Sequence, residues 1–365
     1  MFNHKHYVPI IKWKRGERNA LEKLDPALKT NMTPLLEIQP IPFNHKEGTF
    51  SKTLDQHLEN IGAQVKSAWD QDRPIFVDID TLYENIESSE ETVQSGQHPV
   101  EFIIDIIESN GIKVIPVTGI YRYQSFHDAI ERITTKYHRG ICIRLQEEEL
   151  SDLASLPKVI DDLLDFHKIS PKDVDLILDY KQILPTQEQT HVGNLILLLA
   201  QFPLISEWRT LTIASTAYPK TLQQIATGSN GSIPRTEWSV YQKLLTLSLG
   251  RLPAFSDYNI THPDFVDLDP RLINVAAGIR YTYSNKYYIF RGVSVKKNGF
   301  AQMTSICQDV VQHRCYRGGT FSFGDKEIED CANQTRTTNG NLETWVTAGI
   351  NHHLTLVAKD IANLP

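Results

Sequence analysis

The sequence lacks most features of secreted and membrane-spanning proteins. Its apolar runs fall short of the roughly 20 residues that cross a bilayer, and the first six residues, Met-Phe-Asn-His-Lys-His, contain no apolar signal-peptide core. The formal net charge of −7 gives no overall attraction to nucleic acid or anionic membrane, although a local basic patch is compatible with it. We therefore expect a cytoplasmic protein with no membrane partner.

Cysteine is scarce. The four cysteines, Cys142, Cys307, Cys315 and Cys331, have neither C-x-x-C spacing nor a secretory context. We interpret them as small core residues in a reducing compartment. The alternative is a zinc site made by the last three cysteines with His313, but its spacing matches no standard zinc pattern.

No G-x-G-x-x-G segment follows the first apolar run, which argues against an open nucleotide-binding sheet. Short apolar runs instead alternate with amphipathic stretches, and eight β-then-α units in about 255 residues match the rhythm of a (β/α)8 TIM-like barrel. The predicted strands are 7–14, 34–39, 73–80, 113–118, 141–145, 175–179, 211–215 and 252–257. Residues 279–282 are an alternative for the eighth strand.

The spacing of apolar residues also predicts helices and a second unit. Helices are expected at 17–29 with an interruption at Asp25-Pro26, and at 53–69, 102–107, 126–137, within 148–167, and at 192–199 and 237–249. The segment 228–232, Gly-Ser-Asn-Gly-Ser, is either a flexible loop or a weak phosphate-binding loop. Residues 1–262 thus form the predicted barrel.

Beyond His262 the rhythm changes. Residues 278–283 and 286–291 predict a β-hairpin, 302–313 a helix, and the chain from 342 or 344 onward a final helix after a loop rich in Gly, Asn and Thr. We expect residues 263–365 to form an appended C-terminal α+β subdomain, large enough to act as a lid over the barrel mouth. The predicted fold class is therefore α/β.

Charged side chains end several predicted strands. In the strand 73–80, Arg-Pro-Ile-Phe-Val-Asp-Ile-Asp, alternation puts Phe76, Asp78 and Asp80 on one face. Burying two like charges is costly unless a metal, a cation or hydrogen-bond donors compensate. In a barrel the strand C-termini converge on the face that carries catalytic residues. The residues expected there are Lys12, Lys14, Glu37, Asp78, Asp80, Thr118, Arg144, Asp179, Ser215 and Asp257.

Three interpretations of this cluster are open. In the first, carboxylates hold a divalent cation, Mg²⁺ or Mn²⁺, that assists hydrolysis of a phosphodiester or related bond. The metal ligands would be Glu37, Asp78, Asp80 and Asp257. The catalytic candidates are Lys14 and Arg144 as stabilisers of negative charge, Asp78 and Asp179 as general bases, and His352 as a proton carrier.

In the second interpretation, Lys12, Lys14 and Arg144 neutralise the carboxylates in a buried ion-pair network that is purely structural. In the third, Lys12 or Lys14 forms a Schiff base with pyridoxal phosphate, as in barrels that carry this cofactor on the first strand.

Histidines and arginines add further candidates. No acid/base histidine pair lies at the strand ends; Arg15-Gly16-Glu17 is similar to the first-strand motif of glycerophosphodiesterases, but Lys14 stands where that motif has histidine. Near the C-terminus, His352 or His353 either reaches the barrel mouth or serves in capping or packing. Three arginines of the same region either bind an anionic ligand or form salt bridges: Arg280, Arg291 and Arg317.

Motifs spread over essentially the whole chain resemble the beta protein family, named from a satellite-phage operon that encodes beta beside the toxic Gop protein. The motifs are residues 7–17 (Tyr-Val-Pro-Ile-Ile-Lys-Trp-Lys-Arg-Gly-Glu), 34–37, 77–80, 279–282, 289–292, 321–325, Gly340-Asn341, Trp345 and 351–354. The resemblance transfers no catalytic residues. It implies a component of an antiphage defence module carried by prophages or phage satellites.

Two functions follow as expectations. The first is a metal-dependent hydrolase, phosphodiesterase-like or nuclease-like, that acts on a phosphorylated small molecule, another nucleotide-like substrate or nucleic acid. The second is a non-catalytic binding protein that senses or restrains a toxin-like or antitoxin-like protein of the same operon. The acidic balance and the absence of a basic stripe argue against a strand-annealing protein.

Overall fold

The computed structural model describes residues 2–85, 92–265 and 274–364. Its largest sheet contains parallel strands in the order β1-β2-β5-β6-β7-β8-β9-β11. These are β1 (Ile10–Lys12), β2 (Leu35–Glu37), β5 (Ile75–Asp78), β6 (Val114–Thr118), β7 (Ile141–Gln146), β8 (Val174–Gln182), β9 (Thr210–Thr216) and β11 (Ala254–Ser256). Each lies in or overlaps one of the eight predicted strands, so the strand prediction is confirmed.

The sheet closes on itself. The amide nitrogen of Val8 donates to the carbonyl oxygen of Phe255, and that of Ile10 donates to Asp257, both at 2.9 Å. A parallel bridge also joins Tyr7 to Phe255. The strands therefore form a TIM-like barrel, as predicted, and residues 279–282 belong to another sheet.

The alternation along each strand separates an inner from an outer core. Phe76 packs inside the barrel, whereas Ile75 and Val77 pack outward. The inner core consists of Val8, Ile10, Leu35, Phe76, Ile115, Val117, Cys142, Ile177, Ala214 and Tyr258. Because Asp78 follows Phe76 by two residues, it shares the inward face, as the sequence predicts.

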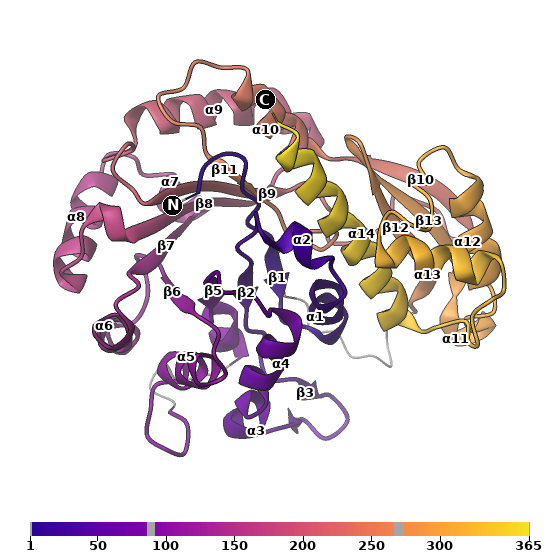
Figure 1. The fold of residues 1–365 in the computed structure, drawn as a ribbon, viewed down its shortest axis with the longest axis horizontal. Coiled ribbons are helices and arrows are strands. Elements are labelled where there is room, and N and C mark those ends of the chain that lie inside the picture. Colours follow the sequence, from indigo (N-terminus) through magenta and orange to yellow (C-terminus); the bar gives the residue numbers. More distant parts are fainter. Residues whose placement is uncertain (1, 86–91, 266–273, 365) are drawn as a thin grey trace.

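Helices surround the barrel (Figure 1). They are α1 (Arg15–Glu22), α2 (Pro26–Lys29), α3 (Leu54–Leu58), α4 (Ile61–Ala68), α5 (Pro99–Ser109), α6 (Gln124–Tyr137), α7 (Glu147–Leu150), α8 (Leu156–His167), α9 (Glu188–Gln201) and α10 (Thr236–Leu245). The predicted break at Asp25-Pro26 is present, with the Asp25 carboxylate capping α2. The predicted helix 53–69 is divided into α3 and α4.

A second unit follows the barrel. Its antiparallel sheet has the order β10-β13-β12, with β10 (Ser229–Pro234), β12 (Ala276–Tyr283) and β13 (Lys286–Ser294). Its helices are α11 (Val295–Asn298), α12 (Met303–Gln312), α13 (Phe323–Ala332) and α14 (Leu342–Ala362). The predicted hairpin is β12-β13, but α13 occupies a stretch predicted as a loop.

The segment 228–232 was predicted as a loop, and this prediction is wrong. Most of it forms β10, which pairs antiparallel with β13 from Ser229 opposite Arg291 onward. The backbone is also crowded: a Cβ added to Gly231 would lie 2.9 Å from the side chain of Ile225. This strand precedes residue 262 in the sequence but belongs to the C-terminal sheet. The two units are therefore not divided in space at the predicted boundary, residue 262.

Helix α14 joins the two units. It contacts α1 on one side and β12 and α13 on the other, and Figure 1 shows it between the barrel and the C-terminal sheet. Thr347 donates to the carbonyl oxygen of Gly16 and Asn351 to that of Ala20, each at 3.0 Å. Because both faces are packed, nearly all its central residues are buried.

Two findings bear on the composition arguments. All four cysteines are free and buried, as predicted for core residues. In the part of the chain that the structure describes, no helix combines the length and apolar character needed to span a bilayer.

Candidate functional site

The mouth of the barrel contains a buried charge cluster centred on Arg144, which projects inward from β7. Its Nη1 donates to Oδ2 of Asp78 at 2.8 Å, its Nη2 to Oε1 of Glu37 at 2.8 Å, and its Nε to Oδ2 of Asp179 at 2.9 Å. These carboxylates come from β5, β2 and β8. Barrel closure therefore brings the ends of three strands to one guanidinium. The Arg144 side chain is 2% exposed.

Two more side chains complete the cluster. The Tyr258 hydroxyl accepts a hydrogen bond from Nη2 of Arg144 at 2.7 Å and donates to Oδ2 of Asp179 at 2.5 Å. Arg122 donates to Oδ1 of Asp78 at 3.3 Å and forms an ion pair with Asp80 at the rim. Sequence reasoning missed both residues, since Arg122 lies after β6 and Tyr258 just after β11.

The surroundings favour the charged form of Arg144. Burial alone would lower the pKa of Arg144, but Tyr258, Asp179, Glu37 and Asp78 together raise it well above its usual value. Burial raises the pKa of Glu37, an effect that Arg144 and Lys12 oppose. Arg144 is consequently cationic at every physiological pH.

Two glutamates at the mouth have an incompletely bonded carboxyl group. Oε2 of Glu37 and Oε2 of Glu17 are buried, and neither has a hydrogen-bond partner among the described residues. Burial raises the pKa of Glu17 to about 8, against the opposing influence of Lys14 and Lys12. Glu17 is therefore largely protonated at neutral pH. The sequence signals for Glu17 were its place after the first strand and its membership of the Arg15-Gly16-Glu17 motif.

Lys12 and Lys14, the two lysines predicted at the mouth, have contacts that differ from those of Arg144. Lys14 is exposed at the start of α1, with its Nζ 5.2 Å from the ring centre of Phe265. Lys12 is buried and donates to the carbonyl oxygen of Asp264 at 2.8 Å. Arg144, in contrast, bonds Glu37, Asp78 and Asp179 together.

The four predicted metal ligands are distributed over separate partners. Glu37 and Asp78 bind Arg144, and Asp80 pairs with Arg122. Asp257 accepts hydrogen bonds from the Tyr7 hydroxyl at 2.6 Å and from Nε2 of His353 at 2.9 Å. Over residues 2–85, 92–265 and 274–364, no group of three or more His, Cys, Asp or Glu side chains is placed to hold a metal ion.

The two adjacent histidines of α14 face in different directions. His353 is the one that reaches the barrel, through Asp257, and its Nδ1 lies 2.8 Å from the Thr282 hydroxyl. Burial lowers the pKa of His353. With the Thr282 hydroxyl as donor to Nδ1, a neutral imidazole satisfies both contacts.

His352 lies in the C-terminal unit, away from the barrel mouth. Its Nδ1 is 2.8 Å from Oδ2 of Asp325 and its Nε2 is 2.7 Å from the carbonyl oxygen of Thr282. A carboxylate and a carbonyl oxygen are hydrogen-bond acceptors, so both ring nitrogens of His352 face an acceptor. The ring also stacks on Tyr281. His352 thus pairs with Asp325 inside the C-terminal unit. This position differs from the predicted one, in which His352 is a proton carrier at the barrel mouth.

The sequence of residues 7–359 matches the family model described as Beta protein. The chain belongs to the Beta protein family. The match includes every strand of the barrel and most of α14, so the Beta protein family covers both structural units.

Other comparisons add little. A search of curated proteins finds no match for this chain. Among solved structures, two variants of the tryptophan synthase alpha subunit from the hyperthermophile Pyrococcus furiosus match with a TM-score of 0.36 and 12% identity, over 71% of this chain and 89% of theirs. The barrel is defined by the strand pairing of this chain itself.

Proposed function

We propose that this Beta protein is a non-catalytic, cytoplasmic binding component of an antiphage module carried by a prophage or a phage satellite, and that it senses or restrains another protein of the same operon. The observation that carries the non-catalytic part is the Arg144 cluster. Glu37, Asp78 and Asp179 each accept a hydrogen bond from one guanidinium, so one oxygen of each carboxylate is already bonded to a cation. Membership of the family supports the operon context.

Residues at the mouth do not fit a divalent cation as they stand. A hard cation is surrounded by six or more oxygen ligands at about 2.0–2.6 Å, and some of these ligands can be waters. Here Arg144 lies where the carboxylates converge, and a guanidinium and a metal ion repel each other. Binding a cation would therefore require breaking a buried network.

A second candidate is the metal-dependent hydrolase. The observation that favours it is the pair of buried glutamates, Glu17 and Glu37, each with an oxygen that has no partner among the described residues. A carboxyl group whose pKa is raised toward 8 is also suited to proton transfer near neutral pH.

Co-purification and phage challenge separate the two candidates. We would express the tagged protein with its operon neighbour, as wild type and as Lys14→Ala, Glu17→Gln and Glu37→Gln variants that remain folded. The binding role predicts that all retain the complex and protection against phage. A folded Glu17→Gln variant that loses protection, with the complex intact, would contradict it and support hydrolysis. If the wild type does not bind the neighbour, the binding role fails outright.

A further inference from the structure

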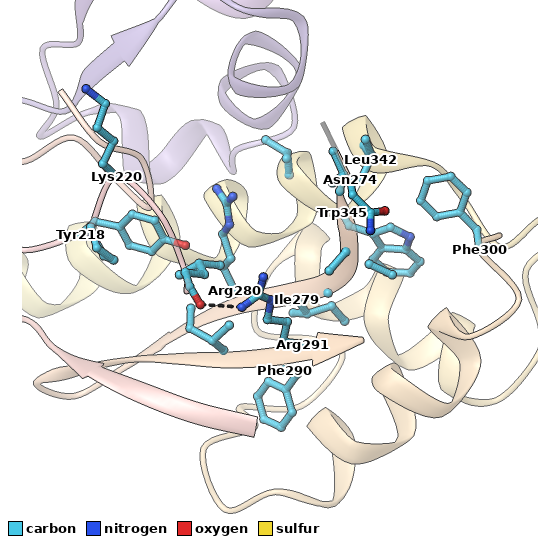
Figure 2. Close-up of a pocket in the computed structure, with 18 residues that line it drawn as sticks. Tyr218, Lys220, Asn274, Ile279, Arg280, Phe290, Arg291, Phe300, Leu342 and Trp345 are labelled. Atoms are coloured by element: carbon cyan, nitrogen blue, oxygen red, sulfur yellow. Dashed lines mark hydrogen bonds between the residues drawn. The ribbon is translucent and has the colours of Figure 1, made fainter. Parts of the chain in front are cut away.

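A groove lies beside the barrel, and none of its lining residues belongs to the Arg144 cluster. We call it the β12–α14 groove. Its volume is about 370 Å³. This value lies within the range of roughly 300–1,000 Å³ that is typical of small-molecule sites. Its walls are the loop after β9, the strands β12 and β13, and the first turns of α14, as Figure 2 shows.

One part of the groove is cationic. The Arg280 guanidinium lies over the ring of Tyr218, 5.3 Å from its centre, and its Nη1 donates to the carbonyl oxygen of Ile260 at 3.2 Å. Arg291 uses its Nη1 for the carbonyl oxygens of Leu222, at 2.6 Å, and of Ile225. Both side chains are half-buried.

These contacts leave donors available. An arginine offers five N–H donors in a planar fork, and the bonds described here use Nη1 alone in each case. No carboxylate among the described residues forms an ion pair with either guanidinium. A phosphate, like a carboxylate, has oxygens that match such a fork with two parallel hydrogen bonds.

The Tyr218 hydroxyl is an independent indication of a ligand. Tyr218 is 3% exposed, and its buried hydroxyl has no hydrogen-bond partner in the described part of the chain. Figure 2 shows this hydroxyl directed toward Arg280. Burial raises the pKa of Tyr218, so the hydroxyl remains a donor at neutral pH. Leaving a buried polar group unbonded is costly, and a ligand oxygen would remove that cost.

The other end of the groove is aromatic and apolar. Figure 2 shows Trp345, Leu342 and Phe300 there, with Arg291 between this end and Tyr218. The indole nitrogen of Trp345 already donates to the carbonyl oxygen of Asn339 at 3.1 Å. Trp345 is 4% exposed, so it offers the groove a small apolar edge, and Asn274 lines the groove as well. Such a surface suits a planar base.

The position agrees with barrel architecture. Barrels frequently bind phosphate at the loops after their seventh and eighth strands. Strand β9 is the seventh strand of this barrel, and the residues that follow it, Tyr218 to Leu222, form a wall of the groove. Lys220, which pairs with Asp264 at 2.9 Å, adds positive charge at the same wall.

We propose that the β12–α14 groove binds a phosphorylated ligand of mononucleotide size, with its phosphate held by Arg280, Arg291 and the Tyr218 hydroxyl and its base against Trp345 and Phe300. The lining of this site includes no residue of the Arg144 cluster, and the proposal goes beyond the proposed partner binding. It would make the protein responsive to a nucleotide.

Isothermal titration calorimetry tests the proposal with the four ribonucleoside 5′-monophosphates, their nucleosides and inorganic phosphate as probes. We expect at least one monophosphate to bind. Its nucleoside and phosphate alone should bind more weakly, since each has half of the contacts. Arg280→Ala should weaken binding by about tenfold or more, because a charge-assisted hydrogen bond is lost. Tyr218→Phe should weaken it several-fold while keeping the melting temperature.

Arg317→Ala is the matched control, because Arg317 is an arginine of the same unit that lies over the rings of Tyr283 and Phe321, outside this groove. It should bind as the wild type does. The proposal is overturned if none of the monophosphates binds, or if Arg280→Ala and Tyr218→Phe bind as well as the wild type. Equal affinity for phosphate and monophosphate would overturn the base-binding half. None of these results bears on co-purification with the operon neighbour, so the two proposals fail separately.

Discussion

The barrel mouth and the β12–α14 groove both depend on arginine, in opposite environments. Arg144 is fully buried and bonded to three carboxylates. Arg280 and Arg291 are half-buried and, within the described residues, bonded only to backbone carbonyls. A buried guanidinium matched by carboxylates holds a structure together, whereas a half-buried one with spare donors is available to a ligand. The two regions should therefore respond differently to the same kind of substitution.

The largest expected effect is the loss of Arg144. Arg144→Met leaves Glu37, Asp78 and Asp179 buried without their common cation, and breaking a buried pair in this way typically costs about 3–5 kcal/mol. Urea unfolding should give that loss, or the variant should fail to fold. Arg144→Lys keeps the charge but not the fork, and we expect an intermediate loss.

Arg132→Met is the surface control for this comparison. Arg132 is about half exposed and pairs with Glu101 at 2.7 Å, and exposed pairs contribute up to about 1 kcal/mol. If Arg144→Met were no more damaging than Arg132→Met, the mouth would not be a stabilising network.

A smaller effect of opposite sign is expected at Glu17, because its carboxyl group is incompletely paired. Its pKa is about 8 in the folded protein against an ordinary value of 4.5, so the unfolded chain loses the proton first as pH rises. The wild type is therefore destabilised progressively between pH 4.5 and 8. Glu17→Gln should be more stable than the wild type by a few kcal/mol at pH 8, with almost no gain at pH 4.5.

Urea unfolding at three pH values checks this dependence. Glu148→Gln serves as the control, because Glu148 is exposed and its substitution should show no comparable trend. A Glu17→Gln gain of equal size at pH 4.5 and pH 8 would mean that Glu17 is ionised in the folded protein.

Arg280→Ala should change stability little, in contrast to Arg144→Met. It removes one hydrogen bond of 3.2 Å to Ile260 and a stacking contact with Tyr218, which together correspond to about 1 kcal/mol. A loss as large as that of Arg144→Met would place Arg280 among the structural arginines and remove the contrast between the regions.

The smallest expected effect is that of a divalent cation. Titrating Mg²⁺ or Mn²⁺ into the wild type should leave the melting temperature unchanged, because Arg144 binds the carboxylates that would hold the ion. A saturable rise that disappears in Asp78→Ala would show that a cation displaces the guanidinium and would favour the hydrolase.

Local patterns were enough for the barrel strands. The period-two alternation in residues 73–80 identified both the strand and the inward face of Asp78, because side-chain direction in a strand depends only on parity. Patterns failed where stability comes from distant parts. Residues 323–332 are rich in polar residues, yet form α13, in which Ile328 packs into the C-terminal core and Ser322 caps the first turn. The Gly-rich segment at 228–232 became a strand because β13 offered it a partner.

Local residue patterns are sufficient to predict an eight-stranded α/β barrel with acidic and basic residues at its strand ends, since each strand and its parity are local properties. Which of these charges meet depends on the three-dimensional arrangement of the strands. Arg144 bonds residues 35, 66 and 107 positions away, and barrel closure, which brings these strand ends together, is not visible in any local window. The same holds for His352 and His353. They are adjacent in sequence, but successive helical residues point in different directions, and so one pairs with Asp325 and the other with Asp257.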